Sequence, residues 1–110
     1  MNGYERASDE IVPAVRLVIA MELRSRYNMT EERIAIILGV AQAAVSKYLN
    51  GKSSATVKEI SERIDRTKIS RHIEAIAKGD EAALNQCICS LCSALNKFDC
   101  KFSAVSNVGK

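Results

Sequence analysis

The sequence contains little of the material from which β-rich folds are built. There is no Trp, aromatic residues make up 5%, and the 110 residues include one Pro and five Gly. A β-sandwich or barrel draws on aromatic and turn-forming residues throughout, so these folds are disfavoured. Hydrophobic residues nevertheless make up 47% of the chain, and they are mostly Ile, Leu, Val and Ala. We therefore expect an α-rich globular protein with an aliphatic core.

Long apolar runs and recognisable catalytic groups are also scarce. The most apolar stretch, residues 11–23, is interrupted by Pro13, Arg16 and Glu22 and is too short to span a bilayer. The N-terminus has no apolar run behind a basic start, so we expect neither a signal peptide nor a membrane partner. The chain has one His and no glycine-rich phosphate loop, so it offers no catalytic constellation. A cytoplasmic protein that is not an enzyme is the expectation.

The net charge of +3 comes from one stretch of the chain. Residues 1–46 contain five basic and six acidic residues, and residues 72–110 contain four of each. Residues 47–71 contain seven basic and three acidic residues, which gives this stretch a charge of +4. A local positive excess of this kind suits a polyanionic partner.

Start and stop signals predict about five helices followed by a C-terminal helical segment. Apolar spacing with Pro13 in the first turn predicts a helix over residues 11–27, and Thr30 before two Glu residues predicts the start of the next. Gly39 ends that helix, and a third helix runs over about residues 42–49 before Asn50-Gly51.

The second half of the chain continues this pattern. Thr56 with Glu59 resembles a capping box that opens a fourth helix. A jump in the apolar register predicts a break near residues 65–68, and a fifth helix then runs to about residue 78. Apolar residues at 84, 88, 91 and 95 predict a further helix. We divide the chain into a flexible N-terminus (1–10), a helical domain (11–78) and a Cys-rich segment (79–110).

The segment Glu31–Asn50, which reads EERIAIILGVAQAAVSKYLN, meets the size requirements of a helix-turn-helix. Ala35 is small where the helices would cross, Gly39 suits a turn with positive φ, and Val45 would pack the second helix on the first. The remaining apolar set is Ile34, Leu38, Val40 and Tyr48. Side chains that reach base edges and phosphates are left on the outer face of the second helix. They are Gln42, Ala43, Ser46, Lys47 and Asn50.

The string LGVAQAAVSKYLNG resembles the turn and recognition helix of the Cro/XRE-like helix-turn-helix transcription regulators. This resemblance covers about residues 11–78 and implies an all-α, λ-repressor/Cro-like domain that binds a double-stranded DNA operator in a sequence-specific manner. It implies major-groove contacts by Gln42, Ala43, Ser46 and Lys47, with Thr30, Asn50 and Lys52 nearer the phosphates. The whole chain also resembles short archaeal regulators with a Cys-rich C-terminal segment.

The alternatives to DNA binding are a helix-turn-helix used for protein contacts and a chance match between two amphipathic helices. If the protein does bind DNA, we expect a homodimer, because one short reading helix covers few base pairs and two-fold operators match two-fold proteins. The helix over residues 11–27 and the segment after Gly79 are the candidate dimer surfaces.

All four cysteines lie in the string CICSLCSALNKFDC, as Cys87, Cys89, Cys92 and Cys100. Four thiolates can hold an iron–sulfur cluster or, alternatively, one Zn²⁺ ion. On a continuous helix, at about 100° per residue, Cys87 points roughly 140–160° away from Cys89 and Cys92. A four-thiolate site therefore requires the chain to leave helical geometry between residues 87 and 92, which conflicts with the apolar stripe.

Several interpretations of the cysteines stay open. An iron–sulfur cluster would let the regulator sense redox or iron state by changing the geometry of the dimer. A structural zinc, or a purely hydrophobic segment, would serve folding or a protein partner. Cys89 and Cys92 could form the dithiol of a small redox protein. Cys87, beside the apolar stripe, also fits a plain core residue.

Overall fold

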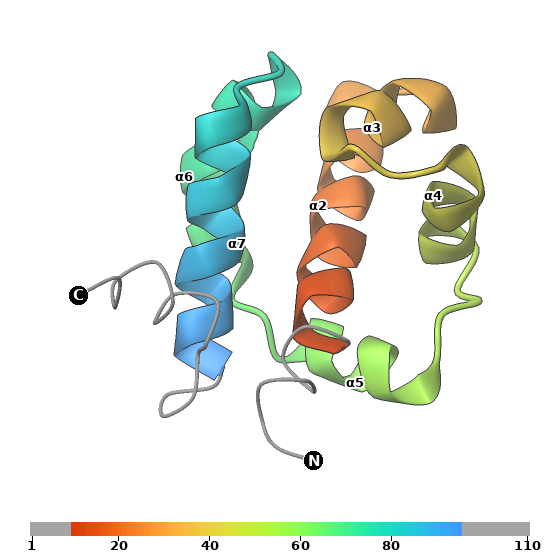
Figure 1. Cartoon of the computed structure of the whole chain (residues 1–110), viewed down its shortest axis with the longest axis vertical. Helices are drawn as coiled ribbons and strands as arrows, with labels where there is room; N and C mark the ends of the chain where they lie inside the picture. The colour runs from red at the N-terminus through yellow and green to blue at the C-terminus, as the bar shows by residue number, and fades with distance from the viewer. Residues whose placement is uncertain (1–9, 96–110) are drawn as a thin grey trace.

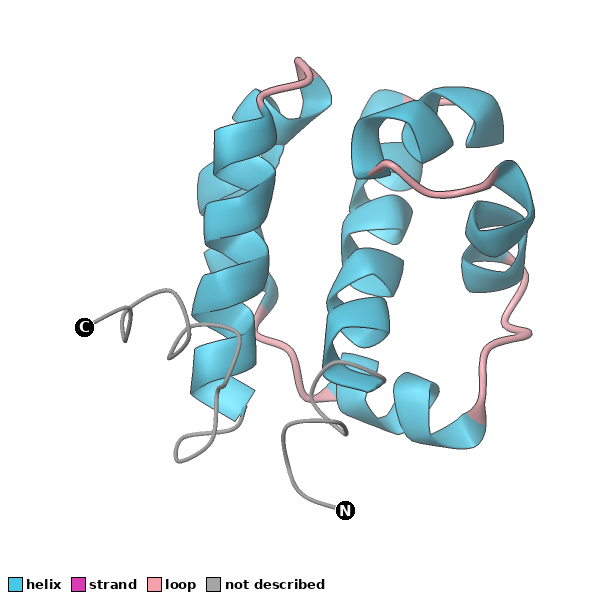
Figure 2. Ribbon diagram, in the orientation of Figure 1, coloured by secondary structure: helices cyan, strands magenta, loops and turns pink. Residues whose placement is uncertain are grey.

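Helix α2 (Val12–Tyr27) lies at the centre of the fold, and the other helices pack around it. The computed structural model describes residues 10–95, with side chains as far as residue 92. The other helices are α3 (Glu31–Leu38), α4 (Gln42–Leu49), α5 (Ala55–Glu62), α6 (Arg66–Ala77) and α7 (Glu81–Leu95), and each contacts α2. In Figure 1, α6 and α7 stand on one side of α2 and α4 on the other, with α3 and α5 at its two ends. The described residues form helices and no strands (Figure 2), which confirms the expected all-α class.

The central position of α2 follows from apolar residues on several of its faces. Pro13 lies in its first turn, as predicted, and Asn28 ends the helix with a left-handed φ of +52°. Buried residues run along the whole helix: Ala14, Val15, Leu17, Val18, Ile19, Ala20, Glu22 and Leu23. Its own chain already covers most of this helix, so only the residues near its C-terminal end, Met21 and 24–27, are exposed and available for the dimer surface expected at residues 11–27.

Local capping signals set the limits of α3 and α4. The Thr30 hydroxyl accepts a hydrogen bond from the Arg33 N–H at 3.1 Å, and Glu31 and Glu32 lie at the positive end of the α3 dipole. Gly39 ends α3 with a φ of +70°, a conformation that costs little without a Cβ. These boundaries, and the span of α4, confirm the predictions made from the sequence.

The start of α5 differs from the prediction. Ser54, not Thr56, is the N-cap residue, and its hydroxyl accepts a hydrogen bond from the Val57 N–H at 3.2 Å. Thr56 lies inside the helix, so the capping box predicted from Thr56 and Glu59 is wrong. Ser54 has the extended backbone that an N-cap requires (φ −62°, ψ 159°), and its hydroxyl reaches the first free N–H groups of the helix.

The predicted breaks before and after α6 are present, although the first lies at residues 63–65 and not at 65–68. Asp65 caps α6, accepting hydrogen bonds from the Thr67 hydroxyl at 2.6 Å and the Thr67 N–H at 3.0 Å, and these bonds lower the pKa of the Asp65 carboxyl. Gly79 follows α6 with a φ of +90°, and Asp80 caps α7 by accepting from the Ala82 and Ala83 N–H groups.

One hydrophobic core includes residues of all the described helices. Residues of α7 belong to the same cluster as the buried side chains of α2, and they are Ala83, Leu84, Cys87, Ile88 and Leu91. The part of the C-terminal segment that the structure describes is therefore packed into the core of the preceding helices. None of the described helices combines the length and the apolar character that crossing a membrane requires.

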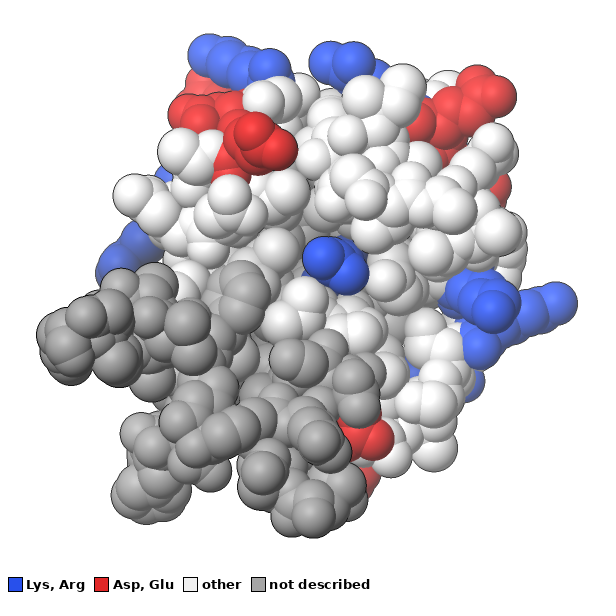
Figure 3. All heavy atoms as spheres, viewed as in Figure 1, with Lys and Arg blue, Asp and Glu red and all other residues white. Residues whose placement is uncertain are grey.

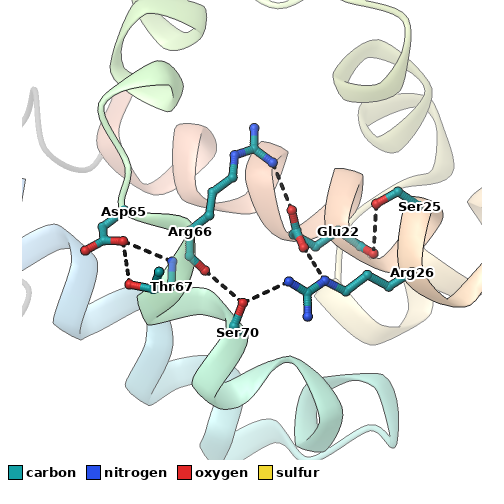
Figure 4. Close-up of polar contacts among 7 residues, drawn as sticks. All are labelled: Glu22, Ser25, Arg26, Asp65, Arg66, Thr67 and Ser70. Atoms are coloured by element: carbon teal, nitrogen blue, oxygen red, sulfur yellow. Dashed lines mark hydrogen bonds and ion pairs between the residues drawn. The ribbon is translucent and has the colours of Figure 1, made fainter.

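A polar network joins α2 to α6 within this packing (Figure 4). Glu22 is buried, with 8% of its surface exposed, and its carboxylate accepts from Arg26 Nε at 2.6 Å and Arg66 Nη1 at 2.9 Å. Arg26 also donates to the Ser70 hydroxyl at 2.9 Å, and that hydroxyl donates to the Arg66 carbonyl at 3.1 Å. The buried charge of Glu22 is therefore paired with the side chains of Arg26 and Arg66.

Candidate nucleic-acid interface

Helices α3 and α4 are joined by a short turn whose backbone is fixed by hydrogen bonds. The Gly39 and Val40 N–H groups both donate to the Ala35 carbonyl, at 2.9 and 3.1 Å. Ala41 then takes an extended conformation (φ −72°, ψ 149°) and leads directly into α4. The turn therefore holds the two helices at a defined angle without a long loop.

The residues predicted to hold the two helices together are buried in the structure. Ala35 is 6% exposed, and Ile34 and Val45 are fully buried. Leu38 is buried as well, whereas Val40 and Tyr48 are partly buried and pack against the core cluster. The predicted internal face of the α3–α4 pair is thus confirmed, and α4 is anchored to the core through Val45.

The outer face of α4 is open to solvent at the predicted positions. Gln42, Ala43, Lys47 and Asn50 are exposed, and Ser46 is partly buried. The Asn50 amide donates to the Ser46 hydroxyl at 3.1 Å, so these two side chains position each other one helical turn apart. This pairing was not foreseen from the sequence, although the spacing of four residues is the signal for it.

The residues expected near phosphates lie at the two ends of the α3–α4 pair. Thr30 is exposed at the start of α3, where its hydroxyl also serves as the helix cap. Lys52 is exposed just beyond α4, and its N–H donates to the Lys47 carbonyl at 2.9 Å. That bond and the positive φ of Gly51 (+68°) hold Lys52 next to the last turn of α4.

No side chain caps the start of α4, because Ala41 occupies the N-cap position. The first N–H groups of a helix are unsatisfied within the helix and carry its positive dipole end. In α4 these groups adjoin Gln42 and Ala43, at the end of the outer face that would meet a ligand. An uncapped start of this kind is suited to an anion such as a phosphate.

The basic side chains of residues 47–71 differ in how free they are to contact a ligand. Lys47, Lys52, Lys58, Arg63 and Arg71 are exposed, and Lys68 is partly buried. Arg66 is exposed as well, but its guanidinium is paired with the buried Glu22. In Figure 3, Lys and Arg side chains gather beside the connection between α4 and α5, and Asp and Glu side chains lie over the region of α3. The basic surface therefore adjoins the C-terminal end of α4.

The cysteines that the structure describes lie on one uninterrupted helix. α7 is α-helical through residues 87–92, so the conflict found in the sequence is resolved in favour of the helix. Cys87 is 1% exposed, and burial raises the pKa of its thiol to about 11. The interpretation of Cys87 as a core residue is confirmed. Cys92 is also buried and packs against Ile11, and Cys89 is partly exposed.

This helix does not bring the cysteines together as a metal site. Within residues 10–92, no group of three or more His, Cys, Asp or Glu side chains is placed to hold a metal ion. Cys100 lies outside the described residues. A four-thiolate site for an iron–sulfur cluster or Zn²⁺ would require α7 to unwind between Cys87 and Cys92, with loss of the packing of Ile88 and Leu91.

Comparison with known proteins gives no family for this chain. No family model matches it, and neither a curated protein nor a solved structure shows significant similarity to it. The functional argument therefore depends on the residues and their geometry.

Proposed function

We propose that this protein is a DNA-binding transcription regulator that uses α4 as its reading helix. One observation carries the proposal: α4 is fixed to the core through the buried Val45, while its opposite face presents Gln42, Lys47 and Asn50 to solvent. A helix held rigidly by one face, with short polar and basic side chains on the other, fits the width of a DNA major groove.

Electrostatics supports the same interface. Lys47 and Lys52 extend from the last turn of α4 and the residues after it, and the uncapped start of α4 lies at its other end. In this proposal the lysines and the helix start bind phosphates and orient α4, while Gln42 reads bases. Gln is suited to adenine, since its amide can donate to and accept from the base edge.

The proposal includes a homodimer, because α4 has eight residues and reaches few base pairs alone. A two-fold dimer would place two reading helices on two half-sites of one operator. The proposal does not include an iron–sulfur or zinc sensor. On α7, which contributes to the core, Cys87 points away from Cys89 and Cys92.

The test uses a labelled pool of random-sequence DNA duplexes, because the operator is not known in advance. Fluorescence anisotropy measured over a range of salt concentrations should show binding that weakens as salt rises. Lys47→Ala and Lys52→Ala should each lower the slope of log affinity against log salt by about one. Gln42→Ala should instead change the sequences recovered by repeated selection from the pool.

Lys78→Ala is the matched control, because Lys78 is also an exposed lysine but lies at the C-terminal end of α6, where it pairs with Glu74 at 3.9 Å. This control should leave DNA affinity and its salt dependence unchanged. If the two α4-region lysines affect binding no more than Lys78, the assignment of α4 as the reading helix is wrong.

A further inference from the structure

An apolar surface at the C-terminal end of α3 has no role in the proposed DNA contact. Ile36 is 70% exposed, far more than the other exposed large hydrophobic residues, Met21 at 39% and Tyr27 at 42%. Ile36 lines a hollow of about 180 Å³ together with Arg33, Ile37, Gly79 and Glu81, a group that we name the Ile36 surface. A single exposed isoleucine is ordinary, but here a second isoleucine and a glycine extend the apolar area.

Two opposite charges border this hollow on different helices. Arg33 belongs to α3 and Glu81 to the first turn of α7, and both side chains are exposed. The ion pairs among the described residues involve Glu22 and Glu74, and none joins Arg33 to Glu81. The surface therefore combines an apolar centre with one cation and one anion at its border.

Gly79 is one of the residues that line this hollow. A Cβ built on Gly79 meets no atom within 4 Å, so the space beside this residue is open. The residues that line the hollow belong to α3, to the turn from α6 to α7 and to the start of α7, and these elements lie at the top of Figure 1.

We propose that the Ile36 surface binds the same surface of a second copy of this chain. In a two-fold contact every pair of residues occurs twice, so Arg33 would face the partner's Glu81 and the partner's Arg33 would face Glu81. Ile36 would enter the partner's hollow beside Gly79. The surface is complementary in charge to itself, and this favours a second copy over a partner of one charge sign.

This contact would form the two-fold dimer that the proposed function includes. The inference rests on the proposed function for the role of the dimer, but not for its existence. None of its residues belongs to the outer face of α4, so Gln42 and Lys47 stay accessible in the dimer. The oligomeric state can be measured without DNA. Failure of DNA binding and failure of the dimer contact are therefore distinguishable.

The experiment is sedimentation equilibrium of the full chain from micromolar to millimolar concentration. The wild-type protein should form dimers, and Ile36→Glu should weaken dimerisation by roughly 100-fold, because the buried contact is lost twice in a symmetric interface. Ile36→Leu should keep the dimer. Ser90→Glu, which adds the same charge at an exposed position of α7, should also leave dimerisation unchanged.

Charge reversal tests the arrangement of the two copies. Arg33→Glu and Glu81→Arg should each weaken the dimer, and the double variant should restore it, because the reversed charges again face each other. Thermal unfolding confirms that each variant is folded. A monomeric wild-type protein, an Ile36→Glu variant that dimerises normally, or a double variant without recovery would each overturn the proposal.

Discussion

The carboxylate of Glu22 on α2 holds the guanidinium of Arg66 on α6, with Oε2 and Nη1 2.9 Å apart. Arg66 belongs to the basic stretch of residues 47–71, whose excess of charge first indicated a polyanionic partner. The structure gives this arginine a second task, since it compensates a carboxylate that is 8% exposed in the core. Positive residues of that stretch are therefore not equivalent.

Arg66→Ala should show that Arg66 contributes to stability, whereas Lys47 and Lys52 contribute to DNA binding. We expect the free energy of unfolding to fall by about 1–2 kcal/mol, because a buried carboxylate loses one of its partners while Arg26 remains. The salt dependence of DNA binding should stay the same. Urea denaturation and anisotropy measure the two effects. Lys52→Ala should show the reverse pattern, and a salt slope changed as much by Arg66→Ala would contradict the distinction.

Ala41 at the uncapped start of α4 offers a test of how near this helix end comes to phosphate. Ala41→Ser and Ala41→Asp should each stabilise the fold by about 0.5–1 kcal/mol, because both side chains accept from the first N–H groups of the helix. Ala41→Asp should nevertheless weaken DNA binding, because its charge repels phosphate, and Ala41→Ser should be much less harmful. Equal affinities for the two variants would place the helix start away from the DNA backbone.

Gly39→Ala should destabilise the protein through backbone conformation alone. The φ of +70° is unfavourable for Ala, but a Cβ at this position meets no atom within 4 Å. We expect a loss of about 1–2 kcal/mol in the free energy of unfolding. Gly39→Asn should lose less, because Asn adopts the left-handed conformation more readily. Equal losses for the two variants would indicate a cause other than backbone strain.

Cys87 should make stability depend on pH in the alkaline range. Its pKa rises from about 9 in the unfolded chain to about 11 in the fold, so the unfolded state loses the thiol proton first. Stability conferred by the neutral thiol is present below pH 9 and is lost between pH 9 and 11, at up to about 1.4 kcal/mol per pH unit. Denaturation of wild-type protein and Cys87→Val at several pH values isolates this contribution, because lysines and tyrosines titrate in both. Parallel pH profiles would show that Cys87 is not buried in solution.

Thiol labelling and metal analysis of protein purified without oxygen should distinguish the helix from a metal site. With α7 intact, an alkylating reagent should modify the partly exposed Cys89 well before the buried Cys87. Iron, sulfide and zinc should then stay far below one equivalent. Stoichiometric metal with joint protection of Cys87 and Cys89 would show that α7 unwinds in the native protein and would restore the sensor hypothesis.

The limits of most helices could be predicted because the signals for them are local. Thr30, Gly39 and Gly51 each act on backbone within a few residues, and the structure places them where the sequence did. The start of α5 was predicted two residues too late, because Thr56 and Glu59 have the spacing of a capping box, whereas the N-cap is Ser54.

Features that depend on distant residues were harder to foresee. The buried Val45 and the exposed Gln42 and Lys47 follow from helical spacing, so this part of the candidate site was predictable. The pairing of Glu22 with Arg66 joins residues 44 positions apart, and no local pattern reveals it. The hollow beside Ile36 is likewise lined by Gly79 and Glu81, which are distant in the sequence, so no local pattern around Ile36 reveals it.

The central position of α2 has a consequence for how the protein is made. α2 is the first described helix to leave the ribosome, and its last partner in the chain, α7, follows after residue 80. The part of α2 that contacts α7 cannot be covered until α7 has also been synthesised. Part of α2 therefore stays uncovered in the nascent chain after α3 to α6 have been made, and the addition of α7 completes the core.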